Sequence, residues 1–135
     1  MLKRVLFLTD ALCKDCFLIA NKFVGNAYSI YYALPEKINN KNHTMFVWED
    51  AGFTCGFLTA YLECGNAYVE NLYVDKNCQR RGIGAALIKA YEDVARKNGA
   101  SSLILQSRNT VQALRFYKKM GFEKIAENMF VGKKL

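Results

Sequence analysis

The hydrophobic pattern of the chain changes its period at two closely spaced glycines, and this change limits the folds that the chain can adopt. Up to residue 74, the segments 44–48, 53–62 and 67–74 are rich in Phe, Tyr, Thr and Val and are separated by short turns that contain glycine. This pattern predicts three strands in an antiparallel meander. Beyond Gly82 and Gly84, apolar residues recur at helical spacing, which predicts a helix. The chain therefore passes from strand through loop to helix, as expected for a mixed α/β fold.

The N-terminal third predicts a strand followed by helical segments. Residues 3–8 have the composition of a short strand, and apolar residues then recur at helical spacing after Thr9 and Asp10, the expected N-caps. An aromatic segment runs up to Pro35, the only proline of the chain. We expect it to stop there, and the polar residues 36–43 to form a loop.

The C-terminal part predicts a strand, a helix and two last strands. Residues 102–106 form a brief apolar run, and Asn109 with a glutamine three residues later resembles a capping box at the start of a helix. Gly121 is expected to end that helix. Segments 122–126 and 129–133 are expected to be the last strands.

Length and composition indicate one soluble domain. A chain of 135 residues suits a single hydrophobic core, so we expect one domain over residues 1–135. Hydrophobic residues make up 52% and charged residues 23% of the chain, which excludes a disordered chain. No apolar run is long enough to cross a membrane, and the N-terminus does not read as a signal peptide. We therefore expect a cytoplasmic protein whose five cysteines are free thiols.

The loop at the change of period has the chemistry of an anion site. It reads Gln79, Arg80, Arg81, Gly82, Ile83, Gly84, Ala85. Glycines let a backbone approach a ligand closely, and the N–H groups of a helix N-terminus attract anions. The loop is not a dinucleotide fingerprint, because position 87 is Leu, and it lacks the Lys of a nucleotide P-loop. Taken alone, such a loop is more often a tight helix start with solvated arginines, and the net charge of +7 does not decide between the two interpretations.

Together with a second segment, this loop resembles the GCN5-related N-acetyltransferase superfamily. Gln79-Arg80-Arg81-Gly82-Ile83-Gly84 after an apolar strand resembles that superfamily's Q/R-x-x-G-x-G/A signature. Its second signature is matched by Asn109, Ala113, Phe116, Tyr117, Gly121 and Phe122. The resemblance covers about residues 44–132, and the N-terminal third only through its order of strand and helices.

The resemblance implies a fold and a cofactor. The fold is a mixed, mostly antiparallel sheet flanked by helices and splayed between its fourth and fifth strands, here 67–74 and 102–106, with acetyl-CoA in the gap. The pyrophosphate would lie on the backbone of the loop, the pantetheine arm would pair with the end of the fourth strand, and the second signature would flank the arm. The residues so assigned to acetyl-CoA are Leu72, Tyr73, Val74, Gln79, Arg80, Arg81, Gly82, Ile83, Gly84, Ala85, Asn109, Ala113, Phe116 and Tyr117. No metal is implied.

Two residues are expected to carry the chemistry of acetyl transfer. Tyr117 occupies the position of the superfamily's general acid, and a phenol is protonated at neutral pH and can donate to a thiolate. The alternative for Tyr117 is a core aromatic beside Phe116. Glu70 precedes the residues that would pair with pantetheine and is the candidate base, the alternative being an exposed strand carboxylate. A backbone N–H near the end of the fourth strand is the expected oxyanion donor.

Two cysteine-based sites are also compatible with the sequence. Cys13-Lys14-Asp15-Cys16 resembles a redox pair, but Pro35 is far from where such a fold would place its cis-proline. Zinc bound by Cys13, Cys16, His43 and another cysteine would not have the spacing of a zinc module. A lone His43 reads more simply as a loop residue.

The acceptor is expected to be a small primary amine. In the superfamily, acceptor specificity lies in the first two helices and the last hairpin, which here carry Tyr28, Tyr31, Tyr32 and the turn Glu127-Asn128. The tyrosines are most simply packing residues. Glu49, Asp50 and Glu70 are expected to hold a cationic amine, and the short chain leaves little room for a protein-substrate domain. The alternatives are a non-catalytic acyl-CoA-binding regulatory domain and an acetyltransferase acting on a protein N-terminus or lysine. We expect no nucleic acid or membrane partner, and a homodimer stays open.

Overall fold

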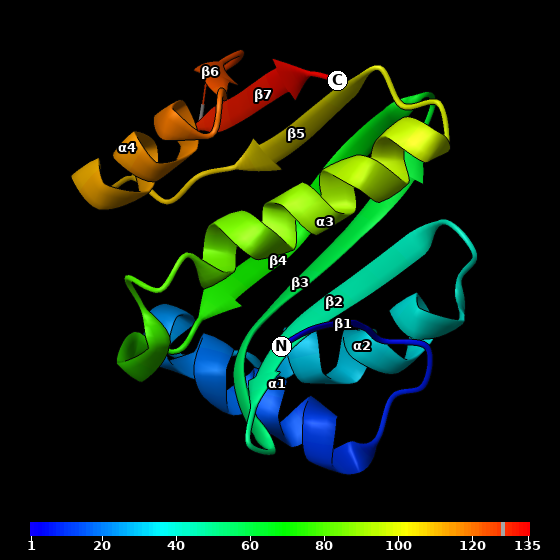
Figure 1. The fold of residues 1–135 in the computed structure, drawn as a ribbon, viewed down its shortest axis with the longest axis vertical. Helices are drawn as coiled ribbons and strands as arrows, with labels where there is room; N and C mark the ends of the chain where they lie inside the picture. The colour runs from blue at the N-terminus through cyan, green and yellow to red at the C-terminus, as the bar shows by residue number, and fades with distance from the viewer. Residues whose placement is uncertain (128) are drawn as a thin grey trace.

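A seven-stranded sheet with helices on both faces makes up the computed structural model, which describes residues 1–127 and 129–135 (Figure 1). The strands are β1 (Leu2–Arg4), β2 (His43–Asp50), β3 (Phe53–Glu63), β4 (Asn66–Val74), β5 (Ser102–Gln106), β6 (Glu123–Lys124) and β7 (Phe130–Lys134). The helices are α1 (Asp10–Val24), α2 (Tyr28–Asn39), α3 (Ile83–Lys97) and α4 (Val111–Lys119), and a short 3-10 turn, η1 (Lys76–Cys78), follows β4. The strand order is β1-β2-β3-β4-β5-β7-β6, and of these neighbours only β4 and β5 are parallel. The predicted mixed α/β fold is confirmed.

The predicted meander is confirmed, whereas the predicted outer strands are too long. The N-terminal strand was expected over residues 3–8, but β1 ends at Arg4. The backbone N–H of Val5 still donates to the carbonyl of Met45 at 2.8 Å, and the chain then leaves the sheet with Leu6 and Phe7 exposed. Residues 3–8 have the composition of a strand, but the residues after Val5 have no neighbouring strand to pair with in the described part of the chain.

The second helix contradicts the expectation that the aromatic segment ends at Pro35 and that a loop follows it. α2 runs through Pro35 to Asn39, and the predicted loop 36–43 is instead the last turn of α2, a short connection and the start of β2. Leu34 is 1% exposed and packs with α1 and the sheet, and Ile38 lies one turn further along the same face. This burial outweighs the one backbone hydrogen bond that a proline removes from a helix.

Helix caps follow the sequence at α1 and depart from it at α4. The Thr9 hydroxyl accepts a hydrogen bond from the N–H of Leu12 at 3.1 Å, as expected for an N-cap. At α4 the cap is Thr110, whose hydroxyl accepts from the N–H of Ala113 at 3.1 Å. The capping box predicted at Asn109 is therefore wrong by one residue, because Thr and Asn are both good N-caps and the sequence alone does not separate neighbours.

Two hydrophobic clusters lie on opposite faces of the sheet. One packs α3 on the sheet and includes the fully buried side chains of Leu58, Tyr91 and Leu103. The other packs α1 and α2 on the opposite face and includes Cys16 and Phe57. None of the helices in the described ranges is long and apolar enough to cross a membrane.

A buried ion pair connects α3 with the last strand. Glu92 lies in α3 with 7% of its side chain exposed, and its carboxylate lies 2.7 Å from Nζ of Lys133 in β7. Arg96, at 3.4 Å, is the second cation near Glu92. Lys133 also donates to the carbonyl of Met120 at 2.8 Å, so that one ammonium joins three elements.

We predict that replacing Lys133 with Met lowers the free energy of unfolding by roughly 2–4 kcal/mol, because a buried carboxylate loses its shortest ion pair while the apolar stem is kept. Urea unfolding followed by circular dichroism measures this loss. Lys134→Met, on the same strand and exposed, is the matched control. A loss no larger than that of the control would show that Arg96 and solvent suffice for Glu92.

Candidate active site

β4 loses one of its two neighbours partway along its length. It pairs with β5 only from Asn66 to Val69, while its pairing with β3 continues to Val74. Figure 1 shows β5 turning away from β4 beyond this point. In an antiparallel pair, alternate residues direct their backbone N–H and C=O groups away from the partner. The edge from Glu70 to Val74 therefore offers backbone groups to an extended ligand, and the predicted splay is confirmed.

A β-bulge stands at the start of this unpaired edge. Thr59 lies opposite Asn71 and Ala60 lies opposite Val69, so Glu70 is the extra residue of β4. A bulge changes the direction of a side chain and often occurs next to a functional site. The candidate base thus lies where the strands begin to separate.

The Glu70 carboxylate is held from two sides. Its Oε2 atom lies 2.9 Å from Nζ of Lys37 in α2, and its Oε1 atom lies 3.2 Å from Nε2 of His43 at the start of β2. Neither partner was expected from the sequence, because both residues fall in the segment predicted to be a loop. A prediction that the helix continues past Pro35 would have placed Lys37 on α2 and made it a candidate partner of Glu70.

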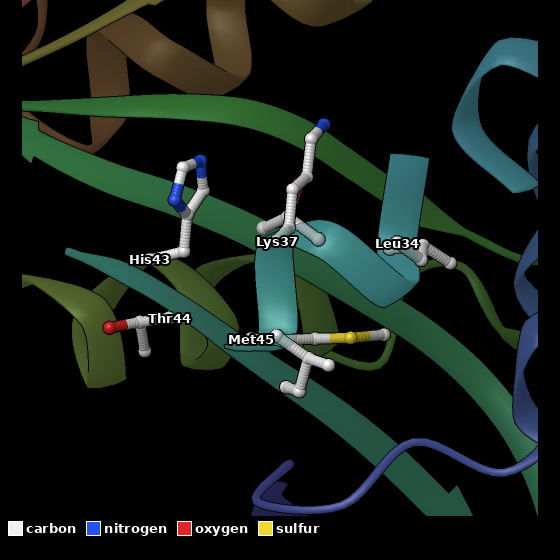
Figure 2. A pocket seen from close by; sticks show the side chains of 7 residues that line it. Leu34, Lys37, His43, Thr44 and Met45 are labelled. Atoms are coloured by element: carbon white, nitrogen blue, oxygen red, sulfur yellow. The ribbon is translucent and has the colours of Figure 1, made fainter. Parts of the chain in front are cut away.

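Lys37 and His43 also flank a small cavity between α2 and the sheet. Figure 2 shows Lys37 extending from α2 and His43 extending from β2 in the same direction. The cavity measures about 10 Å³ and is lined by Leu34, Lys37, Ile38, His43, Thr44, Met45 and Thr59. A water molecule needs about this much space, so the cavity is too small for an acceptor.

The loop after β4 leads into an open helix N-terminus. Asp75 caps η1 by accepting from the N–H of Asn77 at 3.0 Å, and its other oxygen lies 2.9 Å from Nζ of Lys22. Gly82 has a φ of 76° as the N-cap of α3, and no side chain caps the first turn. The first backbone N–H groups of α3 are therefore open to an anion.

The three residues before Gly82 have different surroundings. Nε2 of Gln79 donates to the carbonyl of Val74 at 3.3 Å. Arg80 is exposed and forms no ion pair with the residues that the structure describes. Arg81 pairs with Asp50 at the end of β2, and this hydrogen bond holds the pKa of the Asp50 carboxyl at about 2. Arg80 is thus the arginine that an incoming phosphate meets without displacing a partner.

The start of α3 packs directly on α4. A Cβ atom at Gly84 would lie 3.4 Å from Cζ of Phe116 and 3.7 Å from a methyl of Val74. Ile83 is 1% exposed and belongs to the core, so only its backbone can face a ligand. The second signature therefore meets the loop through Phe116, and Ala113 is partly buried one turn earlier on α4.

Tyr117 is packed between two aromatic rings. Its ring centroid lies 5.1 Å from that of Phe116 and 5.6 Å from that of Phe122. Burial raises the pKa of Tyr117 to about 12, with a smaller contribution from Tyr73 of β4 and an opposing one from Arg108. The phenol is fully protonated at neutral pH. It also lines a pocket of about 520 Å³ between α4 and the β6–β7 hairpin.

Two cations lie over one aromatic ring beside the splay. Nζ of Lys76 is 5.6 Å and Cζ of Arg108 is 5.1 Å from the centroid of Phe23 at the end of α1. Lys76 follows β4 and Arg108 follows β5, and neither forms an ion pair within the described ranges. Positive charge therefore gathers where β4 and β5 end, which suits an anionic ligand.

The acidic residues expected to hold a cationic acceptor are already paired. Glu49 lies 2.9 Å from Nζ of Lys3, Asp50 pairs with Arg81 and with the amino terminus, and Glu70 pairs with Lys37. None of the three offers a free carboxylate in this structure. The sequence predicted that these residues hold a cationic amine, whereas the fold places each of them next to a cation of the chain itself.

The tyrosines expected near the acceptor differ in exposure and in ring contacts. Tyr28 and Tyr32 are 58% and 71% exposed, while the Tyr28 ring also lies 5.1 Å from Phe17. Tyr31 lies 5.3 Å from Tyr32. In the turn expected to contribute to specificity, Asn128 lies outside the described residues.

The cysteines are free thiols in the described chain. Cys13 and Cys16 are buried, and burial raises the pKa of both thiols, which opposes the thiolate that a redox pair needs. Among the residues that the structure describes, no group of three or more His, Cys, Asp or Glu side chains can hold a metal ion.

Comparison with protein families gives a match over most of the chain. The family model described as an acetyltransferase (GNAT) domain matches residues 19–134. An uncharacterized N-acetyltransferase of Methanocaldococcus jannaschii is 34% identical over 82 residues, which cover 57% of this chain and 51% of the relative. Human N-acetyltransferase 8 is 37% identical over 62 residues, 44% of this chain and 27% of the relative. The matches thus span about half, or less, of the length of these relatives.

Solved structures share the fold over nearly the whole chain. An aminoglycoside 6'-N-acetyltransferase complexed with coenzyme A has a TM-score of 0.83 at 13% identity, covering 99% of this chain and 96% of that one. The ribosomal-protein-S18-alanine N-acetyltransferase of Escherichia coli has a TM-score of 0.80 at 18% identity, covering 99% and 94%. At these identities the likeness is one of fold.

Proposed function

The chain belongs to the GNAT acetyltransferase family, and from this premise we propose that it is an acetyl-CoA-dependent N-acetyltransferase acting on a small primary amine. One observation carries the proposal: the unpaired edge of β4 runs directly into the loop that opens α3. An extended pantetheine arm fits the first feature and a pyrophosphate fits the second. The two features follow each other in the order in which acyl-CoA presents these groups.

The residues proposed to bind acetyl-CoA divide into three groups. The backbone of Leu72, Tyr73 and Val74 would pair with the arm. The loop from Gln79 to Ala85 would hold the pyrophosphate, with backbone N–H groups of Gly82, Ile83, Gly84 and Ala85 and the charges of Arg80 and Arg81. Asn109, Ala113, Phe116 and Tyr117 would flank the arm. The uncapped first turn of α3 and the unpaired Arg80 support this assignment.

Acetyl-CoA in excess of its Kd should raise the melting temperature of the protein, since a ligand at 100 times Kd adds about 2.7 kcal/mol of stability. Gly82→Val should abolish this shift, because a branched side chain at the helix start blocks the first N–H groups. The same substitution at Gly65 is the matched control. Gly65 has a φ of 78° with open space around it, so the backbone cost is similar, but it lies in the β3–β4 turn.

A differential scanning experiment separates the outcomes. Gly65→Val should melt at a lower temperature than the wild type and keep the shift. No shift of the wild type at millimolar acetyl-CoA would remove the cofactor from the proposal. An undiminished shift in Gly82→Val would move the phosphate site away from this loop.

The proposed reaction is a direct attack of the amine on the thioester. Acetyl-CoA supplies the acetyl group and a thiolate leaving group. The N–C bond forms first and gives a tetrahedral oxyanion, the C–S bond breaks as this intermediate collapses, and the amine nitrogen loses one proton. Glu70 is proposed to take that proton through water, a backbone N–H of the β4 edge to stabilise the oxyanion, and Tyr117 to donate to the departing sulfur.

The acceptor class is tested by thiol release. We propose a small amine, and a panel of monoamines, polyamines, amino acids and peptides with acetyl-CoA covers the alternatives. Release of thiol with a small amine supports the proposal, and release with peptides alone would indicate a protein N-terminus or lysine as acceptor. Binding of CoA with no release by any amine would indicate a non-catalytic acyl-CoA-binding domain.

A further inference from the structure

A polar cluster lies at the β4 bulge and consists of Lys37, Glu70 and His43. None of these residues belongs to the two sequence signatures. We propose that Lys37 and His43 are positioning residues that hold the Glu70 carboxylate in the orientation in which it accepts the proton of the acceptor amine. This inference rests on the proposed acetyltransferase activity and names the residues that orient its proposed base.

The bulge explains how Glu70 reaches its partners. Leu72 packs with the α3 cluster, whereas Tyr73 packs with the α1–α2 cluster, so side chains alternate between the two faces here. Asn71 donates to the hydroxyl of Thr59 at 2.7 Å, and Thr59 lines the cavity beside α2. Asn71 therefore lies on the α2 face, and so does its neighbour Glu70, which contacts Lys37. Two adjacent residues share a face because the bulge interrupts the alternation.

Lys37 supplies the charge of the cluster. Its side chain is 19% exposed and that of Glu70 is 27% exposed, so both side chains are partly shielded from water. A partly buried ammonium is stabilised by an anionic partner, and the 2.9 Å distance to Oε2 of Glu70 provides it. Lys37 lies in the last turn of α2, where a cation also interacts favourably with the helix dipole.

His43 supplies a neutral hydrogen bond. Its Nδ1 atom is buried and has no hydrogen-bond partner in the described part of the chain. A proton on Nδ1 would be a buried, unpaired donor, which folded proteins contain more rarely than an unpaired acceptor. The structure therefore assigns the proton to Nε2, which donates to Oε1 of Glu70 at 3.2 Å.

The two contacts fix the carboxylate without using all of its capacity. Lys37 engages one oxygen and His43 the other, so rotation of the group is restrained. Each carboxylate oxygen accepts about two hydrogen bonds, so one site on each remains for a water molecule or the amine. Preorganisation of this kind lowers the entropic cost of reaching the reactive geometry.

A double-mutant cycle tests the positioning role. Lys37→Met should lower kcat between about 10-fold and 100-fold with unchanged Kd for acetyl-CoA, as expected when a reacting group is misplaced. Lys37→Arg should restore most of the activity. In a Glu70→Gln background, Lys37→Met should cause no further loss, because the two residues act as one unit. Lys41→Met, an exposed lysine close in sequence, is the control and should match the wild type.

Nitrogen NMR measures the tautomer of His43 without an activity assay. His43 is the only histidine of the chain, so its two ring nitrogens are assigned directly. At neutral pH we expect the neutral tautomer with the proton on Nε2, and a changed Nε2 shift in Glu70→Gln. A proton on Nδ1, or an imidazolium, would overturn the assignment.

The kinetic outcomes are distinguishable. Wild-type protein that turns over no amine would overturn the proposed function itself. Turnover in which the losses from Lys37→Met and Glu70→Gln multiply would overturn only the positioning role. The same conclusion follows if Lys37→Met lowers the melting temperature but not kcat.

Discussion

Replacing Tyr117 with Phe should lower kcat by about 10²- to 10⁴-fold and leave the affinity for acetyl-CoA nearly unchanged, because the proton donor is lost while the ring is kept. The ring contacts with Phe116 and Phe122 do not involve the hydroxyl, so the packing of α4 survives. Burial raises the pKa of Tyr117 to about 12, and the hydroxyl is therefore protonated at neutral pH.

The raised pKa also limits how Tyr117 could act on the proposed leaving group. A thiol with a pKa of about 8.5 is a stronger acid than this phenol, so complete proton transfer to the thiolate is uphill. Tyr117 is therefore expected to act through a hydrogen bond that strengthens as charge develops on sulfur. The loss in Tyr117→Phe should shrink with an acyl donor whose thiol is more acidic, because that leaving group needs less stabilisation.

Tyr91→Phe is the matched control for this prediction. The Tyr91 hydroxyl donates to the carbonyl of Tyr61 at 3.0 Å in the core, far along α3 from the loop. Its loss should lower stability and leave kcat unchanged. If Tyr117→Phe keeps more than about half of kcat while chemistry limits turnover, Tyr117 is a packing residue.

Glu70→Gln should lower turnover by about 10²- to 10⁴-fold, the range expected for loss of a general base. The loss should be largest at low pH, where most of the acceptor amine is an ammonium ion and must lose a proton before it attacks. It should shrink for a weakly basic amine that is neutral when it binds. Steady-state kinetics across pH with two acceptors of different pKa measure both effects.

Glu63→Gln controls for the loss of one negative charge from this end of the sheet. Glu63 ends β3, is exposed, and forms no ion pair with described residues. Its replacement should leave turnover unchanged. Unaltered rates of Glu70→Gln across pH, with an acceptor known to bind as ammonium, would assign Glu70 to structure and the proton to water.

The sequence predicted the fold where one local signal dominated. The change of period at Gly82 and Gly84 and the three β-rich segments led to the meander, α3 and the fold class, all confirmed. Prediction failed where tertiary packing overrides local preference. Pro35 reads as a stop, but the burial of Leu34 and Ile38 against α1 and the sheet carries α2 through it. The prediction of where β1 ends failed for a similar reason, because a strand needs a neighbouring strand and its own residues do not specify that neighbour.

The candidate site divides along the same line. The sequence by itself determined which residues are proposed to carry the chemistry, since the glycines, the arginines and Tyr117 lie in two contiguous segments whose spacing is local. Only the tertiary structure decided their state: Arg81 is engaged by Asp50, Arg80 is not, and Glu70 meets Lys37 and His43. These partners lie on other elements, and a one-residue bulge in β4 decides which face Glu70 occupies. Pairing across a sheet depends on register, and register arises from the packing of the whole chain. The local sequence around a residue therefore does not show which residue of another strand will lie beside it.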